Sequence, residues 1–300
     1  MQLFPKKLSQ IYLVLFVSAF LTITGNFTFF QKTILIYPLS ENWLFLGSLF
    51  FFLFTFLAAL LLLFCYRVTT KPILIALLMI SAIVSYSTNN YGIVFDHNMI
   101  LNTFETDTSE FLDLVSFKSI LYFFIFGLLP SIFVLKVKLK KISFKAQLWE
   151  RIKTFLVLVI IFVIIVLTFS KHYSSFAREN RDLRLYITPT YYLYSATKFV
   201  DSKFATSTKP FEEIGLDAKL NKKSDKRRLV ILVLGETARA DHMSINGYDL
   251  KTNPNLEQEE IISFDKMTSC GTDTALSVPC MFSLLDRSSY NHAKGKNMSN

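Results

Sequence analysis

A carboxylate stands directly behind a short apolar run in the last third of the sequence. Glu236 follows Gly235 and the run at 229–234, which is rich in β-branched residues and typical of a buried parallel strand. Ligands bind beyond the carboxyl ends of such strands, and a carboxylate there can hold a cation such as zinc. The alternative is a glutamate in the first turn of a helix, where the helix dipole favours negative charge.

A second group of polar residues has helical spacing. Asn102, Thr106 and Glu110 are four residues apart, so on one continuous helix they lie within about 80° of each other. A carboxylate with neutral hydrogen-bonding neighbours suits a primary ammonium group. The pattern therefore predicts contact with such a group, and the alternative is the polar face of an amphipathic loop helix.

The sequence has three cysteines. Cys65 ends an apolar run, and we expect it to be chemically inert. Cys270 and Cys280 lie ten residues apart in the polar half, where they are a candidate disulfide that requires an oxidising compartment. The alternative is a pair of free buried thiols.

The composition indicates the elements that must position these residues. Apolar residues make up 52% of the 300 residues and charged residues 18%, against roughly 25% charged in soluble domains. The apolar excess lies before Ser170. The net charge of +9 comes mainly from short loops between apolar runs, a placement that does not indicate a nucleic-acid partner. A buried helical bundle in a soluble protein is disfavoured because its helices are rarely apolar all round.

Five segments are long and apolar enough to suggest membrane-spanning helices. They are residues 11–30, 43–65, 72–87, 120–135 and 155–170. The first is no cleavable signal peptide, because its apolar core is long and no small-residue cleavage site follows. Lys and Arg gather before the first span and in the loops at 67–71 and 136–153, which marks those segments as cytoplasmic. The N-terminus is then inside, and everything after Ser170 is outside.

These features predict three parts of the chain. Residues 1–170 form a transmembrane domain with a periplasmic loop at 88–118. Residues 171–228 form one or two short helices on the membrane surface and a linker, because clustered tyrosines suit the membrane interface. Residues 229–300 begin an α/β domain, with a possible second strand at 261–264.

Two longer motifs carry a family resemblance. Residues 235–242 read GETARADH, and residues 270–283 read CGTDTALSVPCMFS. Together they resemble the signature of the lipid A phosphoethanolamine transferases, which include the mobile colistin-resistance enzymes of the alkaline-phosphatase and sulfatase superfamily. The resemblance implies five transmembrane helices and a periplasmic α/β domain, as the spans and their orientation also suggest.

The resemblance implies roles for individual residues. Thr274 corresponds to the nucleophile, Glu236 to a zinc ligand beside Thr274, and Cys270–Cys280 to a disulfide. Asn102, Thr106 and Glu110 correspond to a set that holds the donor headgroup. A threonine hydroxyl needs a metal or base to react, and zinc lowers the pKa of a bound oxygen. Thr274 can also act as a helix N-cap.

The activity implied is transfer of phosphoethanolamine from phosphatidylethanolamine to lipid A or inner-core lipopolysaccharide. It would take place at the bacterial inner membrane with Zn²⁺ as cofactor, and would confer polymyxin resistance.

The resemblance also implies a longer protein, because the family's remaining zinc ligands lie in a C-terminal part that has no counterpart here. His242 and His292 match none of them. We therefore expect the 300-residue chain to be truncated and inactive by itself. The alternatives are a phosphoglycerol transferase of the lipoteichoic-acid type, a sulfatase-like hydrolase and a non-enzymatic membrane remnant.

Overall fold

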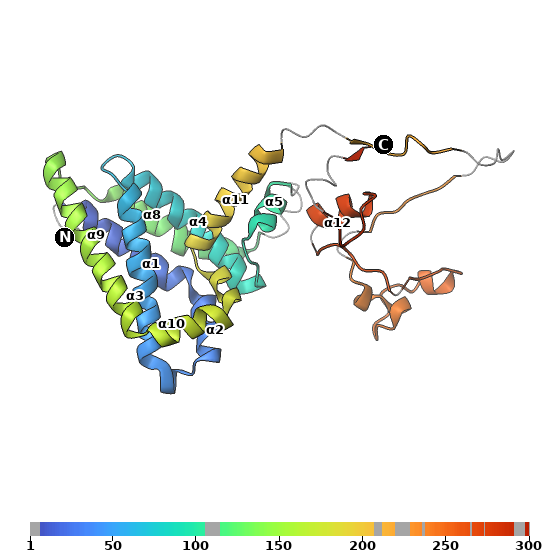
Figure 1. Cartoon of the computed structure of the whole chain (residues 1–300), viewed down its shortest axis with the longest axis horizontal. Helices are drawn as coiled ribbons and strands as arrows, with labels where there is room; N and C mark the ends of the chain where they lie inside the picture. Colours follow the sequence, from blue (N-terminus) through green and yellow to red (C-terminus); the bar gives the residue numbers. More distant parts are fainter. Residues whose placement is uncertain are drawn as a thin grey trace. The chain divides into compact units, whose positions relative to one another are not determined.

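The computed structural model describes residues 7–105, 115–206, 212–219, 229–235, 238–264, 266–272, 274–290 and 298–299. The chain divides into two compact units, Met1–Asp201 and Ser202–Asn300. We call them the membrane unit and the C-terminal unit, and describe each by itself (Figure 1).

Long apolar helices form the membrane unit. Among the residues that the structure describes, four segments are long and apolar enough to cross a membrane: α3 (Leu39–Phe64), α4 (Thr70–Tyr91), the segment Phe117–Lys136, and α9 (Phe144–Thr168). A bent pair, α1 (Gln10–Gly25) and α2 (Phe27–Ile36), makes a fifth if it is counted as one span. The predicted α-helical membrane domain is confirmed, and its five predicted spans agree with the count that takes the bent pair as one span.

The first span, predicted at 11–30, is bent. Its two helices meet at 58°, and the break lies at Asn26, whose backbone is non-helical. The Asn26 amide donates to the carbonyls of Leu21 and Thr22, each at 3.2 Å. The buried Asn26 side chain thus hydrogen-bonds to the last turns of α1, and the chain changes direction there before α2 begins.

The fourth span is also irregular. It consists of α7 (Phe117–Phe123), the π-helix η1 (Phe124–Leu128) and α8 (Leu129–Lys136). Pro130 follows the π-helix and has no N–H to donate to the carbonyl four residues before it, so the widened turn relieves a clash in the helix.

The helices pack side by side in the order α9, α3, α1, α4 and then the fourth span. A core of leucines and valines from α1, α3 and α4 is centred on Leu13, Val14, Ala58, Leu74 and Leu78, all fully buried. About half of the apolar windows of α3 and α4 is buried, but only 11% of that of α9. The outward surface of α9 is therefore apolar, as a lipid-facing surface must be.

The segment after the last span folds into short helices: α10 (Ser170–Glu179), the 3₁₀-helix η2 (Arg181–Tyr186) and α11 (Thr190–Thr206). Aromatic rings join α10 to α3, where Phe45 stacks on His172 at 5.2 Å and meets Phe176 edge-on at 5.8 Å. Another short helix, α5 (His97–Glu105), follows α4.

The C-terminal unit contains little regular structure among its described residues. It has α12 (Thr274–Met281), the 3₁₀-helices η3 (Ala240–His242), η4 (Ser244–Asn246) and η5 (Leu256–Gln258), and a parallel pair of two-residue strands, β1 (Glu212–Glu213) and β2 (Met298–Ser299).

The strands predicted at 229–234 and 261–264 are wrong for this structure. Neither segment is a strand, and the side chains of Leu229 and Val233 are 86% and 83% exposed. A strand is defined by its hydrogen-bonded neighbour, and no described segment pairs with either run.

Candidate functional site

Thr274 is the first residue of α12 in the C-terminal unit. Thr274 is exposed at the surface of the C-terminal unit. The first turn of a helix has backbone N–H groups without helical partners, and the helix dipole adds positive potential there. A phosphate brought to Thr274 would meet both.

The disulfide between Cys270 and Cys280 braces this helix. The two Cα atoms are 6.4 Å apart, and the bridge joins the loop before Thr274 to the last turn of α12. Gly271 lies so close to the helix that a Cβ there would overlap the Leu276 side chain. The loop, the disulfide and the helix thus form one local assembly, and Thr274 is the first residue of its helix.

A charged cluster that the sequence analysis did not single out lies in the same unit. Arg239 donates to the Asp241 carboxylate from Nε at 3.0 Å and from Nη2 at 2.6 Å, and His242 Nδ1 lies 3.1 Å from it. The Arg239 guanidinium, with a smaller effect of His242, holds the pKa of Asp241 well below its usual range. All three side chains are exposed, so solvent screens the cluster and it contributes little to stability.

The Arg239 cluster belongs to a hydrogen-bonded turn. Asn246 donates its side-chain amide to the Ala240 carbonyl at 3.1 Å, and the Thr252 hydroxyl donates to the His242 carbonyl at 2.8 Å. These hydrogen bonds could not be predicted from the motif GETARADH, because they depend on local turns and not on a periodic spacing of residues.

Asn102, in the membrane unit, lies on α5 and is half-buried. The Asp96 carboxylate accepts from the Met99 N–H at 2.8 Å at the start of this helix. Phe104 stacks on Phe199 of α11, with ring centroids 5.2 Å apart, and so fixes α5 against α11. Thr106 and Glu110, the other two members of the predicted set, lie outside the described residues.

Polar aromatic residues of α11 lie beside α5. Burial and the negative charge of Asp96 raise the pKa of Tyr191. Lys198 lies over the Tyr194 ring, 4.8 Å from its centroid. From the sequence these tyrosines are predicted only to lie at the membrane interface, because the proximity of Tyr191 to Asp96 depends on the packing of α5 on α11.

The predicted metal ligands are not brought together in the part of the chain that the structure describes. Glu236 lies outside it, and within it no three His, Cys, Asp or Glu side chains are grouped as a metal would require. Thr274 offers one oxygen donor, and a zinc site needs about four ligands.

Comparison with known proteins identifies the family. The family model described as phosphoethanolamine transferase EptA/EptB matches residues 53–204, and the sulfatase model matches residues 228–300. Phosphatidylethanolamine transferase Mcr-1 of Escherichia coli is 39% identical over 293 residues, which is 96% of this chain and 54% of that protein. Phosphoethanolamine transferase EptA of Salmonella typhimurium is 29% identical over 94% of this chain and 53% of its own length.

A solved structure agrees with these matches. The integral membrane protein lipooligosaccharide phosphoethanolamine transferase A (EptA) from Neisseria meningitidis superposes with a TM-score of 0.89 at 28% identity, covering 98% of this chain and 56% of that one. The chain thus spans about half the length of the relatives it matches. On the match of its membrane unit, the chain belongs to the EptA/EptB phosphoethanolamine transferase family.

Proposed function

We propose that this chain is part of an enzyme that moves phosphoethanolamine from phosphatidylethanolamine to lipid A or to inner-core lipopolysaccharide. The observation that carries the proposal is the position of Thr274, exposed at the start of a disulfide-braced helix in a chain of this family. The relatives' names, phosphatidylethanolamine transferase and phosphoethanolamine transferase, support the donor and the group transferred.

The reaction has two balanced steps. Thr274 Oγ attacks the phosphorus of the donor, the bond to the glycerol oxygen breaks, and diacylglycerol leaves with the threonine proton. Phosphoethanolamine then stays on Thr274 until a phosphate or sugar hydroxyl oxygen of the acceptor attacks the phosphorus. The bond between the phosphorus and Thr274 Oγ breaks, and the proton of the acceptor hydroxyl passes to Oγ, which restores the threonine. The first turn of α12 stabilises the phosphoryl charge in both steps.

Zinc is the proposed cofactor, with Glu236 and Thr274 among its ligands. When bound, it would supply positive charge that lowers the pKa of the threonine hydroxyl. On the donor side, Asn102 is proposed to contact the headgroup together with Thr106 and Glu110. Packing of α5 on α11 through Phe104 and Phe199 supports this by holding Asn102 on a fixed helix.

The proposed location is the bacterial inner membrane, with the N-terminus in the cytoplasm and Thr274 in the periplasm. The basic segments between the spans support this orientation. The product carries an added ammonium group, so cationic peptides such as polymyxins are attracted less strongly to the cell surface.

The test is mass spectrometry of lipid A from a polymyxin-sensitive host. The chain is expressed alone and also extended with the C-terminal half of a relative such as Mcr-1. We expect a phosphoethanolamine mass addition from the extended protein, which Thr274→Ala lowers by about a thousandfold or more and Thr274→Ser lowers less.

Thr272→Ala is the matched control, because it removes a hydroxyl in the same loop without touching the proposed nucleophile. A Thr274→Ala protein that still adds phosphoethanolamine would refute the assigned role. An addition to core sugars instead of lipid A would identify inner-core lipopolysaccharide as the acceptor and would leave the proposed reaction at Thr274 unchanged.

A further inference from the structure

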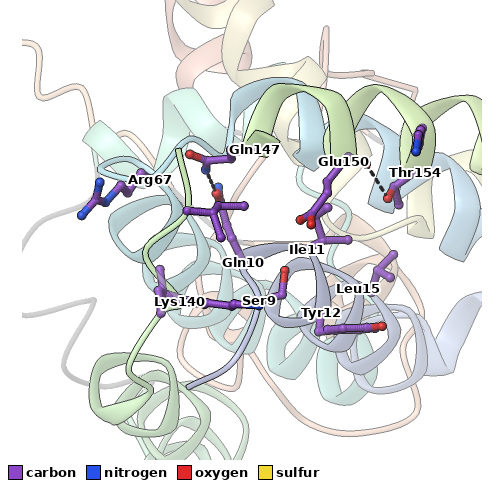
Figure 2. A pocket seen from close by; sticks show the side chains of 13 residues that line it. Ser9, Gln10, Ile11, Tyr12, Leu15, Arg67, Lys140, Gln147, Glu150 and Thr154 are labelled. Atoms are coloured by element: carbon purple, nitrogen blue, oxygen red, sulfur yellow. Dashed lines mark hydrogen bonds between the residues drawn. The ribbon is translucent and has the colours of Figure 1, made fainter. Parts of the chain in front are cut away.

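A cavity of about 420 Å³ lies at the end of the membrane unit where the basic segments gather. Its walls come from the start of α1, the turn between α3 and α4, the segment 139–142 and the first turns of α9 (Figure 2). We call it the basic-end pocket. It shares no residue with the proposed transfer site.

Hydrogen bonds fix the walls of the basic-end pocket. Leu8 pairs with the segment after α8, where its N–H donates to the Lys138 carbonyl at 3.0 Å and its carbonyl accepts from Lys140 at 2.9 Å. The buried Gln10 side chain donates to the Cys65 carbonyl at 2.5 Å and accepts from Gln147 of α9 (Figure 2). These hydrogen bonds hold the walls of the pocket in a defined arrangement.

The charge of the pocket is positive. Arg67, Lys140 and Lys153 line it, against one carboxylate, Glu150, so the formal sum is +2. Within the described residues, no ion pair joins Glu150 to any of these cations. The neighbouring Arg151 is not available to a ligand, because it donates to the carbonyls of Leu62 and Cys65 at the end of α3.

The pocket continues onto apolar surface. Tyr12 and Leu15 line it, and Tyr12 is 66% exposed on the outward side of α1. Phe16, one turn further along α1, is 55% exposed, and Trp149 of α9 is 59% exposed. A ligand with a phosphate in the pocket could therefore lay acyl chains along α1 and α9.

We propose that the basic-end pocket binds the headgroup of an anionic diacyl phospholipid from the leaflet at that end. Its phosphate meets Arg67 and Lys140, its hydroxyls meet Gln147 and Thr154, and its chains follow the exposed side chains of α1. Basic recesses at the cytoplasmic side of membrane helices recognise anionic headgroups in this way. The proposal goes beyond the transfer reaction and does not depend on it.

Trp149 of α9 serves as the reporter, because Lys153, which lines the pocket, lies 5.0 Å from its ring centroid. The chain has two tryptophans, so Trp43→Phe leaves Trp149 as the only tryptophan, which can be excited selectively at the red edge of its absorption. The protein is placed in phosphatidylcholine nanodiscs that contain rising fractions of dibrominated phosphatidylglycerol or dibrominated phosphatidylethanolamine. Bromine quenches the indole on contact, so we expect quenching by phosphatidylglycerol to saturate at a lower fraction than quenching by phosphatidylethanolamine.

Two double variants separate the pocket from diffuse surface charge. Arg67→Gln with Lys140→Gln removes two exposed lining cations, and Lys141→Gln with Lys145→Gln removes two exposed cations of the same segment that do not line the pocket. We expect the first pair to weaken the preference for phosphatidylglycerol by about tenfold or more, and the second pair by less than about threefold. Equal losses from both pairs would show diffuse attraction and overturn the proposal.

Glu150→Gln and inorganic phosphate test the nature of the ligand. Removing the carboxylate should strengthen binding of the anionic lipid, whereas a loss together with strong quenching by phosphatidylethanolamine would indicate a zwitterionic headgroup and contradict the proposal. Millimolar phosphate should not relieve the quenching. Relief would mean that the pocket takes a soluble phosphate instead of a lipid.

Discussion

At the scale of single residues, one buried asparagine connects two distant parts of the membrane unit. Asn26 is 1% exposed, donates to the Thr188 carbonyl at 2.8 Å and accepts from the Thr188 N–H at 2.9 Å. This pair joins the break between α1 and α2 to the segment before α11. Both polar groups of the Thr188 backbone are satisfied by one side chain, and Thr188 itself is buried.

Asn26→Leu should therefore lower the free energy of unfolding by about 1–3 kcal/mol, because it leaves buried backbone groups unpaired. The measurement is an unfolding titration in detergent micelles. Asn42→Leu is the control, since the Asn42 side chain makes a single 3.3 Å bond to the Pro38 carbonyl. Equal effects of the two changes would show that the Thr188 pairing is not important for stability.

The role of a single residue can be predicted from the sequence only where the residue type itself indicates that role. Cys270 and Cys280 could be paired on spacing and compartment, and the structure joins them. Thr274 and Glu236 rested on the motifs, and their chemistry stays a prediction. Asn26 could not be predicted, because its partner is 162 residues away and an asparagine within an apolar run looks like an ordinary polar interruption.

At the scale of elements, helices were predictable and strands were not. A membrane helix satisfies its own backbone, so a long apolar segment is sufficient to predict it. A strand needs a neighbour, and the apolar run at 229–234 has none among the described residues. The irregular points, the break at Asn26 and the π-helix at 124–128, depend on side-chain bonds and on Pro130, which average hydrophobicity does not report.

The close packing of the π-helix η1 against α4 can be tested by mutation. Gly127 lies in η1, and a Cβ there would stand 3.1 Å from the Ala82 Cβ of α4 and 3.3 Å from the Phe123 ring. Gly127→Leu should force α4 and the fourth span apart and destabilise the membrane unit by about 1–3 kcal/mol. Thermal unfolding in detergent would show this as a lower midpoint.

Gly47→Leu is the control for that change. Gly47 lies within α3, and a Cβ there has nothing within 4 Å, so leucine is tolerated and improves the helix propensity. A loss at Gly47 as large as the loss at Gly127 would mean that a larger side chain in any of these helices is harmful, and that close packing at η1 is not the cause.

At the scale of the whole molecule, two independent signals support the proposed orientation in the membrane. The basic segments lie before the first span, between the second and third, and between the fourth and fifth, which puts them on one side. The disulfide in the C-terminal unit requires an oxidising compartment, and both of its cysteines follow the fifth span in the sequence, so an odd number of predicted spans separates them from the basic N-terminal segment. The two signals come from different physics, so their agreement supports a cytoplasmic basic end.

Cysteine labelling tests this orientation with little background from the chain itself. Cys65 is fully buried, and Cys270 and Cys280 are joined, so the natural cysteines should react slowly with a membrane-impermeant maleimide. Lys141→Cys places a thiol in the basic segment, and Ser174→Cys places one on α10 after the fifth span, both at exposed positions. In spheroplasts we expect labelling of the 174 variant alone, and labelling of both variants after the membrane is permeabilised.

Labelling of the 141 variant in intact spheroplasts would reverse the orientation. Thr274 would then lie in the cytoplasm, where a disulfide is not maintained. The basic-end pocket would then face the periplasmic leaflet and not the cytoplasmic one.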